Sequence, residues 1–408
     1  MEKDFNSKIK KKHFLKLVTP VLVCAILVYL SFAIGYTQGQ KNFVSKNQDK
    51  VVNTESGKPK DVSFSIFWET WNKLREKSVT ETDAQKMIDG SISGMVSSLD
   101  DPYTMFMSKE ENKRFREDIS GEFGGIGVEI APKDGVPTVV SALDGTPAQK
   151  AGIKTGDIVD EVDGTKTSTI SFEETINKIR GQKGSEVKLK IVRAATADPI
   201  EYSVVRDTIV VKSVQWERKK EGSKDILYIK VRQFGDDTSK GFSDIAKEVA
   251  ASKPDGIVVD LRNNPGGYLV TAVDLASYFI DGGVVVSEKG KNDKVKEYKT
   301  TTKARLKNYK LAVLVNKGSA SASEIFAGAV QDRGSGKIFG EKTFGKGSVQ
   351  ELVELSDGSA LKVTVAKWFT PKGRQINEQG ISPDVEVSDQ ESTADDEQLI
   401  KALEYVRN

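Results

Sequence analysis

Apolar residues recur every three or four positions in two segments near the start of the chain, which is the period of an amphipathic helix. The segments are residues 64–77, "FSIFWETWNKLREK", and residues 83–99, "DAQKMIDGSISGMVSSL". The stretch "DDPYTMFMSKEE", residues 100–111, is predicted to be a turn that leads into another helix. Residues 61–120 are therefore predicted to form an N-terminal helical region.

The pattern changes near Gly121 to that of short strands separated by glycine-rich turns. Up to about Val211 the predicted strands are "GGIGVEI", "PTVVSAL", "DIVDEVDG" and "EVKLKIVR", with one helix, "SFEETINKIRG", among them. Beyond Val211 the strands "GIVVDL", "LAVLVN" and "GKIFG" alternate with the helices "YLVTAVDLASYFI" and "SASEIFAGAVQD". This alternation predicts parallel strands joined by crossover helices. A last helix, "TADDEQLIKALEYVR", is predicted to be capped by Thr393.

The segment 17–36, "LVTPVLVCAILVYLSFAIGY", is 20 residues long and carries no charge, which is about the length that crosses a bilayer as a helix. The lysines before it predict that residues 1–16 stay in the cytoplasm and that the chain after residue 36 lies outside. A cleaved signal peptide is the alternative, with Ala33 and Gly35 at its cleavage site. The apolar run exceeds the usual signal-peptide core of about 7–15 residues, so we predict a single-pass anchor in the cell membrane. Residues 37–60 read as a linker.

The charge balance argues against a polyanionic partner. The chain has 61 basic and 59 acidic side chains, for a net charge of +2. Six lysines against Glu2 and Asp4 in the first sixteen residues leave the rest of the chain slightly negative. Nucleic-acid binding is therefore not expected. The only cysteine, Cys24, lies inside the predicted span, so no disulfide is expected in the part outside.

Ser319, Ser321 and Ser323 crowd the start of the helix in "SASEIFAGAVQD", which suggests a nucleophile. The only histidine, His13, lies in the N-terminal tail. A Ser/His/Asp triad, a Cys/His dyad and a histidine-bearing zinc site are therefore excluded from the part outside. A nucleophilic serine there needs a lysine or a carboxylate as its base. A lysine can serve if burial removes its proton.

Lys346 is the best candidate for that base. It stands between two glycines in "EKTFGKGSVQELVEL", at the start of a strand-like run. Gln350 is four residues further on and therefore lies on the same face of the strand, where it could orient the amine. The alternative is a hairpin corner with an exposed lysine, because such turns are common.

The stretch "VVDLRNNPGGYLVTAV" predicts a strand, a turn and the start of a helix. Its glycine amides could face a developing negative charge, as in an oxyanion hole. An ordinary strand-to-helix turn and a phosphate cradle are the alternatives, and neither a GxGxxG nor a Walker pattern is present.

In their order along residues 61–390, these stretches resemble the carboxyl-terminal processing peptidases, the tail-specific serine proteases. The likeness includes "DPYTMF", "GGIGV", "PAQKAGIKTGDIV", "DLRNNPGG", "GSASASEIFAGA", "EKTFGKGSVQ" and "TPKGRQINEQGISPD". The resemblance implies that Ser321 is the nucleophile and that Lys346 is its general base, oriented by Gln350. It implies oxyanion donors at the N–H of Ala322 and of Gly266 or Gly267, a choice that the sequence leaves open.

The resemblance also implies a PDZ domain, whose carboxylate-binding loop would be Gly125, Ile126 and Gly127. Taken alone, "GGIGV" is better explained as a glycine turn that opens a strand. The implied fold class is an α/β catalytic core of the ClpP/crotonase-like type with a PDZ domain, an N-terminal helical region and one transmembrane helix. The predicted order is cytoplasmic tail 1–16, transmembrane anchor 17–36, linker 37–60, helical region 61–120, PDZ domain 121–207, serine protease core 208–390 and C-terminal helix 391–408.

The implied function is that of a membrane-anchored extracytoplasmic serine endopeptidase, which cleaves proteins near free C-termini without metal or cofactor. The helical region from Asp61 could form a homodimer. Two alternatives come from other classes of protein. One is a non-catalytic PDZ adaptor for exported proteins, which would have no need of Ser321, Lys346 and Gln350 together. The other is a crotonase-like acyl-transfer enzyme, which a PDZ domain and an outside location make a poor fit.

Overall fold

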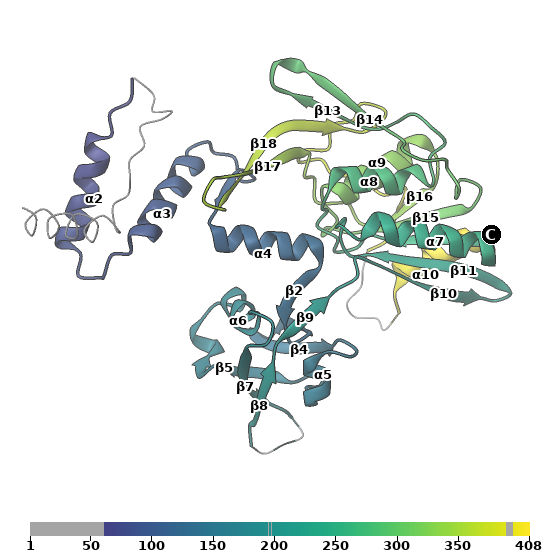
Figure 1. Cartoon of the computed structure of the whole chain (residues 1–408). Coiled ribbons are helices and arrows are strands. Elements are labelled where there is room, and N and C mark those ends of the chain that lie inside the picture. The colour runs from purple at the N-terminus through teal and green to yellow at the C-terminus, as the bar shows by residue number, and fades with distance from the viewer. Residues whose placement is uncertain (1–60, 195, 197, 389–394) are drawn as a thin grey trace, which may run out of the picture. The chain divides into compact units, whose positions relative to one another are not determined.

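The computed structural model describes residues 61–194, 196, 198–388 and 395–408 (Figure 1). The chain divides into two compact units, Met1–Thr82 and Asp83–Asn408. The first unit contributes one described helix, α2 (Ser65–Lys77), none of whose residues is buried. Everything that builds the site belongs to the second unit.

The predicted fold class requires a correction, because it included a transmembrane helix. No helix in the described ranges is both long and apolar enough to cross a membrane. The longest described helix, α7 (Thr238–Ser252), has 15 residues, whereas a span needs about 20. Residues 17–36, where the span was predicted, lie outside the described residues.

The start of each of two further helices in the N-terminal region is fixed by a capping residue. The Asp83 carboxylate accepts two backbone N–H groups at the start of α3 (Ala84–Ser97), and Ser108 forms a capping box with Glu111 at the start of α4 (Lys109–Ser120). Between these helices lies a short strand, β1 (Met105–Met107), where the sequence predicted only a turn.

A small β domain follows α4. Its main sheet has the strand order β3-β4-β5-β7-β8, with β6 beside β5, and a separate pair, β2 and β9, links it to the rest of the chain. Apolar side chains that alternate along these strands, such as those of Val187, Leu189 and Ile191, fill a core of their own. The elements are β2 (Glu122–Gly125), β3 (Val128–Lys133), β4 (Val136–Ala142), α5 (Pro147–Ala151), β5 (Ile158–Val162), β6 (Thr165–Lys166), α6 (Phe172–Ile179), β7 (Glu186–Val192), β8 (Ile200–Val205) and β9 (Asp207–Val210).

The predicted alternation of strands and helices beyond Val211 is confirmed. A six-stranded sheet has the order β10-β11-β12-β15-β16-β19, and all of its pairs except β10 with β11 are parallel. Its strands are β10 (Val214–Glu221), β11 (Lys224–Val231), β12 (Gly256–Asp260), β15 (Lys310–Val315), β16 (Lys337–Gly340) and β19 (Val385–Glu386).

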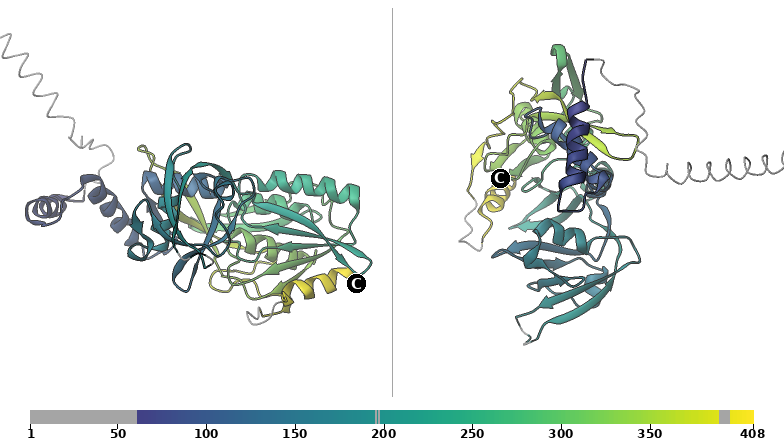
Figure 2. Two further views of the ribbon diagram at one scale, coloured as in Figure 1. Left: turned by 90° about the horizontal axis from the view of Figure 1, so that it is seen from below. Right: turned by 90° about the vertical axis from the view of Figure 1, so that its left-hand side faces the viewer.

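Helices cover both faces of this sheet. Side chains of α7, α8 (Leu269–Ser277) and α9 (Ala322–Arg333) form one large core with it, while α10 (Glu397–Arg407) packs on a second, smaller core. Figure 2 shows the yellow α10 and the teal α7 on opposite sides of the strands. The residue that caps α10 is Asp396, whose carboxylate accepts the Leu399 N–H, and the predicted cap Thr393 lies outside the described residues.

A second sheet stands beside this α/β layer. Its strands are β1, β13 (Val284–Gly290), β14 (Val295–Lys299), β17 (Ser348–Glu354) and β18 (Ala360–Phe369). Strand β18 pairs with β17 along one edge and with β1 and β13 along the other. The sheet therefore combines a strand that precedes the β domain with strands that follow it.

Candidate active site

The three crowded serines differ in their surroundings. Ser319 and Ser323 are fully buried, and their hydroxyls donate to the carbonyls of Leu261 and Asn264, at 2.8 and 2.9 Å. Ser321 is only half-buried, and no group in the described part of the chain accepts the proton of its hydroxyl. Ser319 and Ser323 therefore hold the loop on the strand-to-helix turn, whereas the Ser321 hydroxyl is left available for reaction.

The backbone at Ser321 is held in an unusual conformation. Its φ of 53° and ψ of −113° lie where non-glycine residues are rarely found, at a cost of about 1–3 kcal/mol. Ser321 is also the N-cap of α9, so its side chain stands at the positive end of that helix. Such strain persists only where the surrounding structure fixes it.

Glu324 provides that fixation. Its carboxylate is completely buried and accepts four hydrogen bonds. One oxygen accepts the hydroxyl of Thr343 at 2.6 Å and the N–H of Gly345 at 2.7 Å. The other accepts the backbone N–H of Ser321 at 2.8 Å and of Lys346 at 2.9 Å. The two backbone nitrogens can be no further apart than the sum of those last distances, so Ser321 and Lys346 are brought together by a single oxygen.

Burial raises the pKa of Glu324, and its four hydrogen bonds oppose that effect. All four contacts are donors to the carboxyl group. A protonated carboxyl would place its own hydrogen among those donors, whereas the ionised form satisfies each of them. We therefore treat Glu324 as a buried carboxylate.

Lys346 is half-buried, which removes the alternative of an exposed lysine in a hairpin corner. The indole N–H of Trp368 donates to its carbonyl at 3.0 Å. A side chain at the preceding or following residue could not be accommodated, because a Cβ on Gly347 would lie 2.2 Å from the backbone nitrogen of Asn377. The turn "GKG" is thus fixed by the Trp368 indole and by close packing against the Asn377 backbone.

The amine of Lys346 is easily deprotonated. Burial, helped by the positive charge of Lys362, lowers its pKa to about 8, although the carboxylates of Glu324 and Asp101 oppose the shift. Its Nζ lies 5.2 Å from the centre of the Tyr103 ring. A lysine with such a pKa carries a substantial fraction of neutral amine near neutral pH, which a general base requires.

Both glycines of the turn "NPGG" are needed for close packing. A Cβ on Gly266 would lie 2.8 Å from the Cβ of Ser321 and 3.0 Å from the Ala322 nitrogen, and one on Gly267 would lie 2.3 Å from the Phe234 carbonyl oxygen. The Gly266 N–H already donates to the Asn264 side chain, at 2.9 Å. Among the described residues nothing accepts the N–H of Gly267 or of Ala322.

Gln350 does not contact Lys346 through a hydrogen bond. Its side-chain nitrogen lies 2.6 Å from the hydroxyl of Ser348 and 3.4 Å from that of Thr364.

The sequence also missed three side chains around the Lys346 amine, those of Asp101, Tyr103 and Lys362. The stretch "DPYTMF" was the signal that could have found the first two.

The loop Gly125, Ile126 and Gly127 is buried at the edge of the β domain. The carbonyl oxygens of Ile126 and Gly127 accept the N–H groups of Ala148 and Leu143, at 2.8 and 2.9 Å. In the described chain, the N–H groups of Ile126 and Gly127 have no acceptor. Two neighbouring amides without partners are suited to bind a carboxylate.

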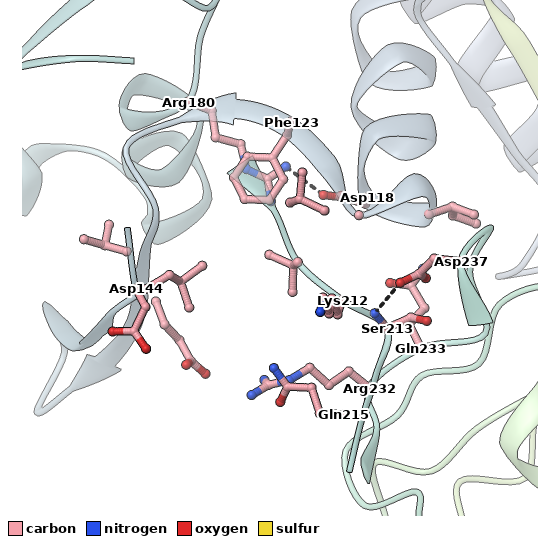
Figure 3. Close-up of a pocket in the computed structure, with 17 residues that line it drawn as sticks. Asp118, Phe123, Asp144, Arg180, Lys212, Ser213, Gln215, Arg232, Gln233 and Asp237 are labelled. Atoms are coloured by element: carbon pink, nitrogen blue, oxygen red, sulfur yellow. Dashed lines mark hydrogen bonds and ion pairs between the residues drawn. The ribbon is translucent and has the colours of Figure 1, made fainter. Parts of the chain in front are cut away.

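A pocket of about 800 Å³ lies between this β domain and the α/β core (Figure 3). Arg180 donates to Asp118 at 2.7 Å on one wall and covers the Phe123 ring at 4.3 Å. Arg232 points in from the core side, and its buried Nε has no partner. Ser321 and Lys346 do not line the pocket. Phe234, which follows the lining residue Gln233, donates its N–H to the Gly266 carbonyl at 2.8 Å.

Three family descriptions match parts of the sequence. Residues 225–387 match peptidase family S41, residues 138–193 match the PDZ domain, and residues 21–111 match the N-terminal domain of the activating protease CtpB. The first two matches fall on the α/β core and on the small β domain.

Similar proteins are C-terminal processing proteases. The carboxy-terminal processing protease CtpA of Bacillus subtilis (strain 168) is 36% identical over 382 residues, which cover 92% of this chain and 76% of that protein. A probable CtpA-like serine protease of Staphylococcus aureus (strain COL) is 40% identical over 307 residues, which cover 75% of this chain and 61% of the relative. Among solved structures, a photosystem II D1 C-terminal processing protease is 30% identical and aligns with a TM-score of 0.52, over 83% of this chain and 90% of that one.

Proposed function

Because this chain belongs to peptidase family S41 and to its carboxyl-terminal processing proteases, we propose that it cleaves proteins near their C-termini through Ser321 and Lys346, with its PDZ domain recognising the free end. Membership of a serine peptidase family argues against both alternatives from the sequence, the non-catalytic adaptor and the acyl-transfer enzyme.

One observation carries the assignment of the residues. The backbones of Ser321 and Lys346 donate to the same oxygen of Glu324. The Ser321 hydroxyl donates to no group in the described part of the chain, and the pKa of Lys346 is lowered to about 8. A nucleophile and a base must be neighbours, and the base must lose its proton near the working pH. The shared oxygen keeps the two backbones close and the lowered pKa supplies neutral amine, so both requirements support this pair.

In the proposed reaction, neutral Lys346 takes the proton of the Ser321 hydroxyl while the oxygen attacks the scissile carbonyl. The resulting ammonium gives that proton to the leaving amine, so an acyl-enzyme remains and the C-terminal fragment departs. Water, deprotonated by the same lysine, then hydrolyses the ester and restores the serine.

For the oxyanion hole we propose the N–H groups of Ala322 and Gly267. Both lack an acceptor among the described residues, whereas the N–H of Gly266 is already occupied by Asn264. Gly266 then serves by having no side chain, since a Cβ there would press on Ser321. Donors of this kind typically contribute about a hundredfold to a thousandfold in rate.

Two parts of the proposal concern the substrate tail. The unpartnered amides of Ile126 and Gly127 support binding of a terminal carboxylate, with Gly125 shaping the loop. The pocket beside this loop supports a path for the bound chain towards the core (Figure 3). The role of Gln350 in orienting Lys346 is supported only through the Ser348 and Thr364 hydroxyls that it contacts.

Two predictions about the surroundings of the enzyme stay predictions from the sequence. An extracytoplasmic location depends on residues 1–36, which lie outside the described residues. A homodimer through the helical region is supported by α2, where Ile66 and Leu74 are exposed together with Trp68. Sedimentation of the wild type and of Ile66→Ser would test it, and equal masses for the two would contradict a dimer through this face.

The test of function is peptide cleavage by the purified full-length protein. An unstructured peptide is offered with a free and with an amidated C-terminus. We expect Ser321→Ala and Lys346→Met to lower kcat/KM on the order of a thousandfold or more. The control Lys342→Met replaces an exposed lysine in the same loop and should leave kcat/KM unchanged.

The outcomes separate the parts of the proposal. Preference for the free C-terminus supports tail recognition, and equal cleavage of both peptides contradicts it. Cleavage by Ser321→Ala at the wild-type rate would sink the assignment of the nucleophile.

A further inference from the structure

The stretch "DPYTMF" has no part in the reaction described so far, yet the fold brings it to the base. Strand β1 pairs with β18 in antiparallel register, Met105 opposite Lys362. Just before β1, the Thr104 hydroxyl accepts the backbone N–H of Thr364 at 3.0 Å. These contacts place Asp101 and Tyr103 on the side of the β17–β18 sheet where Lys346 lies.

The Asp101 carboxylate is fixed by several donors. It accepts the Tyr103 N–H at 3.1 Å and the Thr104 hydroxyl at 2.6 Å, and the Thr364 hydroxyl donates to it as well. The same Thr364 hydroxyl contacts the side-chain nitrogen of Gln350 at 3.4 Å. Gln350 is thus connected to Asp101 through one threonine.

Four side chains from three segments act on the amine of Lys346. Its nitrogen lies 5.2 Å from the centre of the Tyr103 ring, a distance at which an aromatic face attracts a cation. The carboxylates of Asp101 and of Glu324, on α9, also favour its charged form, while the ammonium of Lys362, on β18, opposes it. Lys362 forms no ion pair in the described part of the chain, and its own nitrogen lies 5.4 Å from the centre of the Phe115 ring.

We propose that Asp101 and Tyr103 are positioning residues of the active site, which hold the Lys346 side chain and stabilise its ammonium form, with Lys362 as the opposing charge. The segment before the PDZ domain is then part of the catalytic apparatus of the core.

The reaction gives this arrangement a purpose. Lys346 starts as a neutral amine and becomes an ammonium in the transition state for attack by Ser321. A carboxylate and a ring face beside it stabilise the positive charge when it forms, as the aspartate of a Ser/His/Asp triad does for its imidazolium. Lys362 limits this effect, because an ammonium that was too stable would not release its proton to the leaving amine.

The inference rests on the proposed function, so the test begins with the full-length wild type and Ser321→Ala on one peptide. If these two cleave alike, the proposed function itself fails. If only the wild type cleaves, kcat and kcat/KM are measured against pH for Asp101→Asn, Lys362→Met, Tyr103→Leu and Tyr103→Phe. Asp100→Asn is the matched control, because it removes the same charge from the exposed neighbouring residue.

We expect opposite shifts from the two charge changes. Asp101→Asn removes a negative charge and should move the acid limb of kcat/KM down by roughly one pH unit, whereas Lys362→Met should move it up by about as much. The plateau kcat of Asp101→Asn should fall roughly tenfold. Tyr103→Phe keeps the ring and should keep kcat, while Tyr103→Leu should lower it. Asp100→Asn should match the wild type.

Three results would overturn the inference. Acid limbs that coincide for Asp101→Asn, Lys362→Met and the wild type would show that neither charge acts on Lys346. Shifts in the same direction would show a loss of structure instead. Equal kcat for Tyr103→Leu and Tyr103→Phe would remove the ring from the site. Should Asp101→Asn fail to fold, the Lys362 and Tyr103 variants still decide.

Discussion

At the scale of single residues, the proposed role of Lys346 as general base ties the pH range of the enzyme to the protonation of its amine. Its pKa is lowered to about 8 by burial and by Lys362. Below that pH the amine is mostly charged and cannot accept the proton of Ser321. We therefore expect kcat/KM to rise with pH and to level off above about 8. A profile that is flat from pH 6 to pH 9, measured with a peptide free of titrating groups, would contradict Lys346 as the base.

Glu324 offers a second test at this scale. In Glu324→Gln the amide group keeps the size of the carboxylate but turns an NH₂ towards two of the four donors. Two buried donors then lose their acceptor, at about 1–3 kcal/mol each. We expect a lower unfolding free energy and a kcat reduced at least tenfold, because the hydrogen-bond network that joins the backbones of Ser321 and Lys346 is disrupted.

Denaturant unfolding and steady-state kinetics on the same preparation check this result. Glu351→Gln, which changes an exposed carboxylate on β17, is the control. Wild-type stability together with wild-type kcat in Glu324→Gln would show that the shared oxygen does not hold the site.

In the sequence, the lack of a histidine outside the N-terminal tail left a lysine or a carboxylate as the base, and the resemblance then proposed Ser321 and Lys346. The sequence could not identify the partners of Glu324, because three of the four come from a loop about twenty residues away. A glutamate in the first turn of a helix reads as a response to the helix dipole. Only the fold shows that its carboxylate also receives Thr343, Gly345 and Lys346.

At the scale of elements, periodicity was most reliable where it was longest. The all-buried run of β12 and the apolar face of α8 are visible in the sequence, because each pattern repeats over several residues. Strand β1 was missed because three residues are too few to show a period of two. Its partner on β18 lies far along the chain, so no local signal marks the pairing.

Arg262 fixes the end of β12, and its replacement gives a prediction at the scale of elements. Its guanidinium binds the buried Asp260 at 2.7 Å and also Asp396, the cap of α10, at 2.7 Å. Arg262→Met leaves the Asp260 charge buried without its partner, so we expect the unfolding free energy to fall by about 3–5 kcal/mol. Thermal unfolding of Arg262→Met measures this loss of stability. The control is Arg305→Met, which replaces an exposed arginine. Equal melting temperatures for the two variants would refute the assignment.

At the scale of the whole molecule, the PDZ domain and the α/β core have separate hydrophobic cores. The PDZ domain is stabilised by Arg193, which binds the fully buried Asp157 at 2.6 Å. Burial alone would raise the pKa of Asp157, but the hydrogen bonds from Arg193 and from the Lys154 N–H outweigh it and lower that pKa. The contribution to stability is therefore complete at neutral pH, and it is lost as the pH falls from the ordinary range of a carboxyl towards this lowered pKa.

We expect Arg193→Met to unfold the PDZ domain before the core. Two thermal transitions should replace one, since the buried Asp157 is left without its partner and each core melts on its own. Cleavage of an amidated peptide should persist at temperatures between the transitions, while the preference for a free C-terminus is lost. A single transition that abolishes both activities together would show that the domains unfold as one.

The pairing of β1 with β18 also has a consequence for the way the cell makes this protease. Thr104, beside β1, and Thr364, on β18, are 260 residues apart in the chain. At a translation rate of about 5 to 20 residues per second, the first segment leaves the ribosome roughly 13 to 50 s before its partner. Until β18 emerges, Lys346 lacks the neighbours that bury it and keeps its proton. With Lys346 as the proposed base, we therefore expect no cleavage by the growing chain until β18 has emerged and paired with β1.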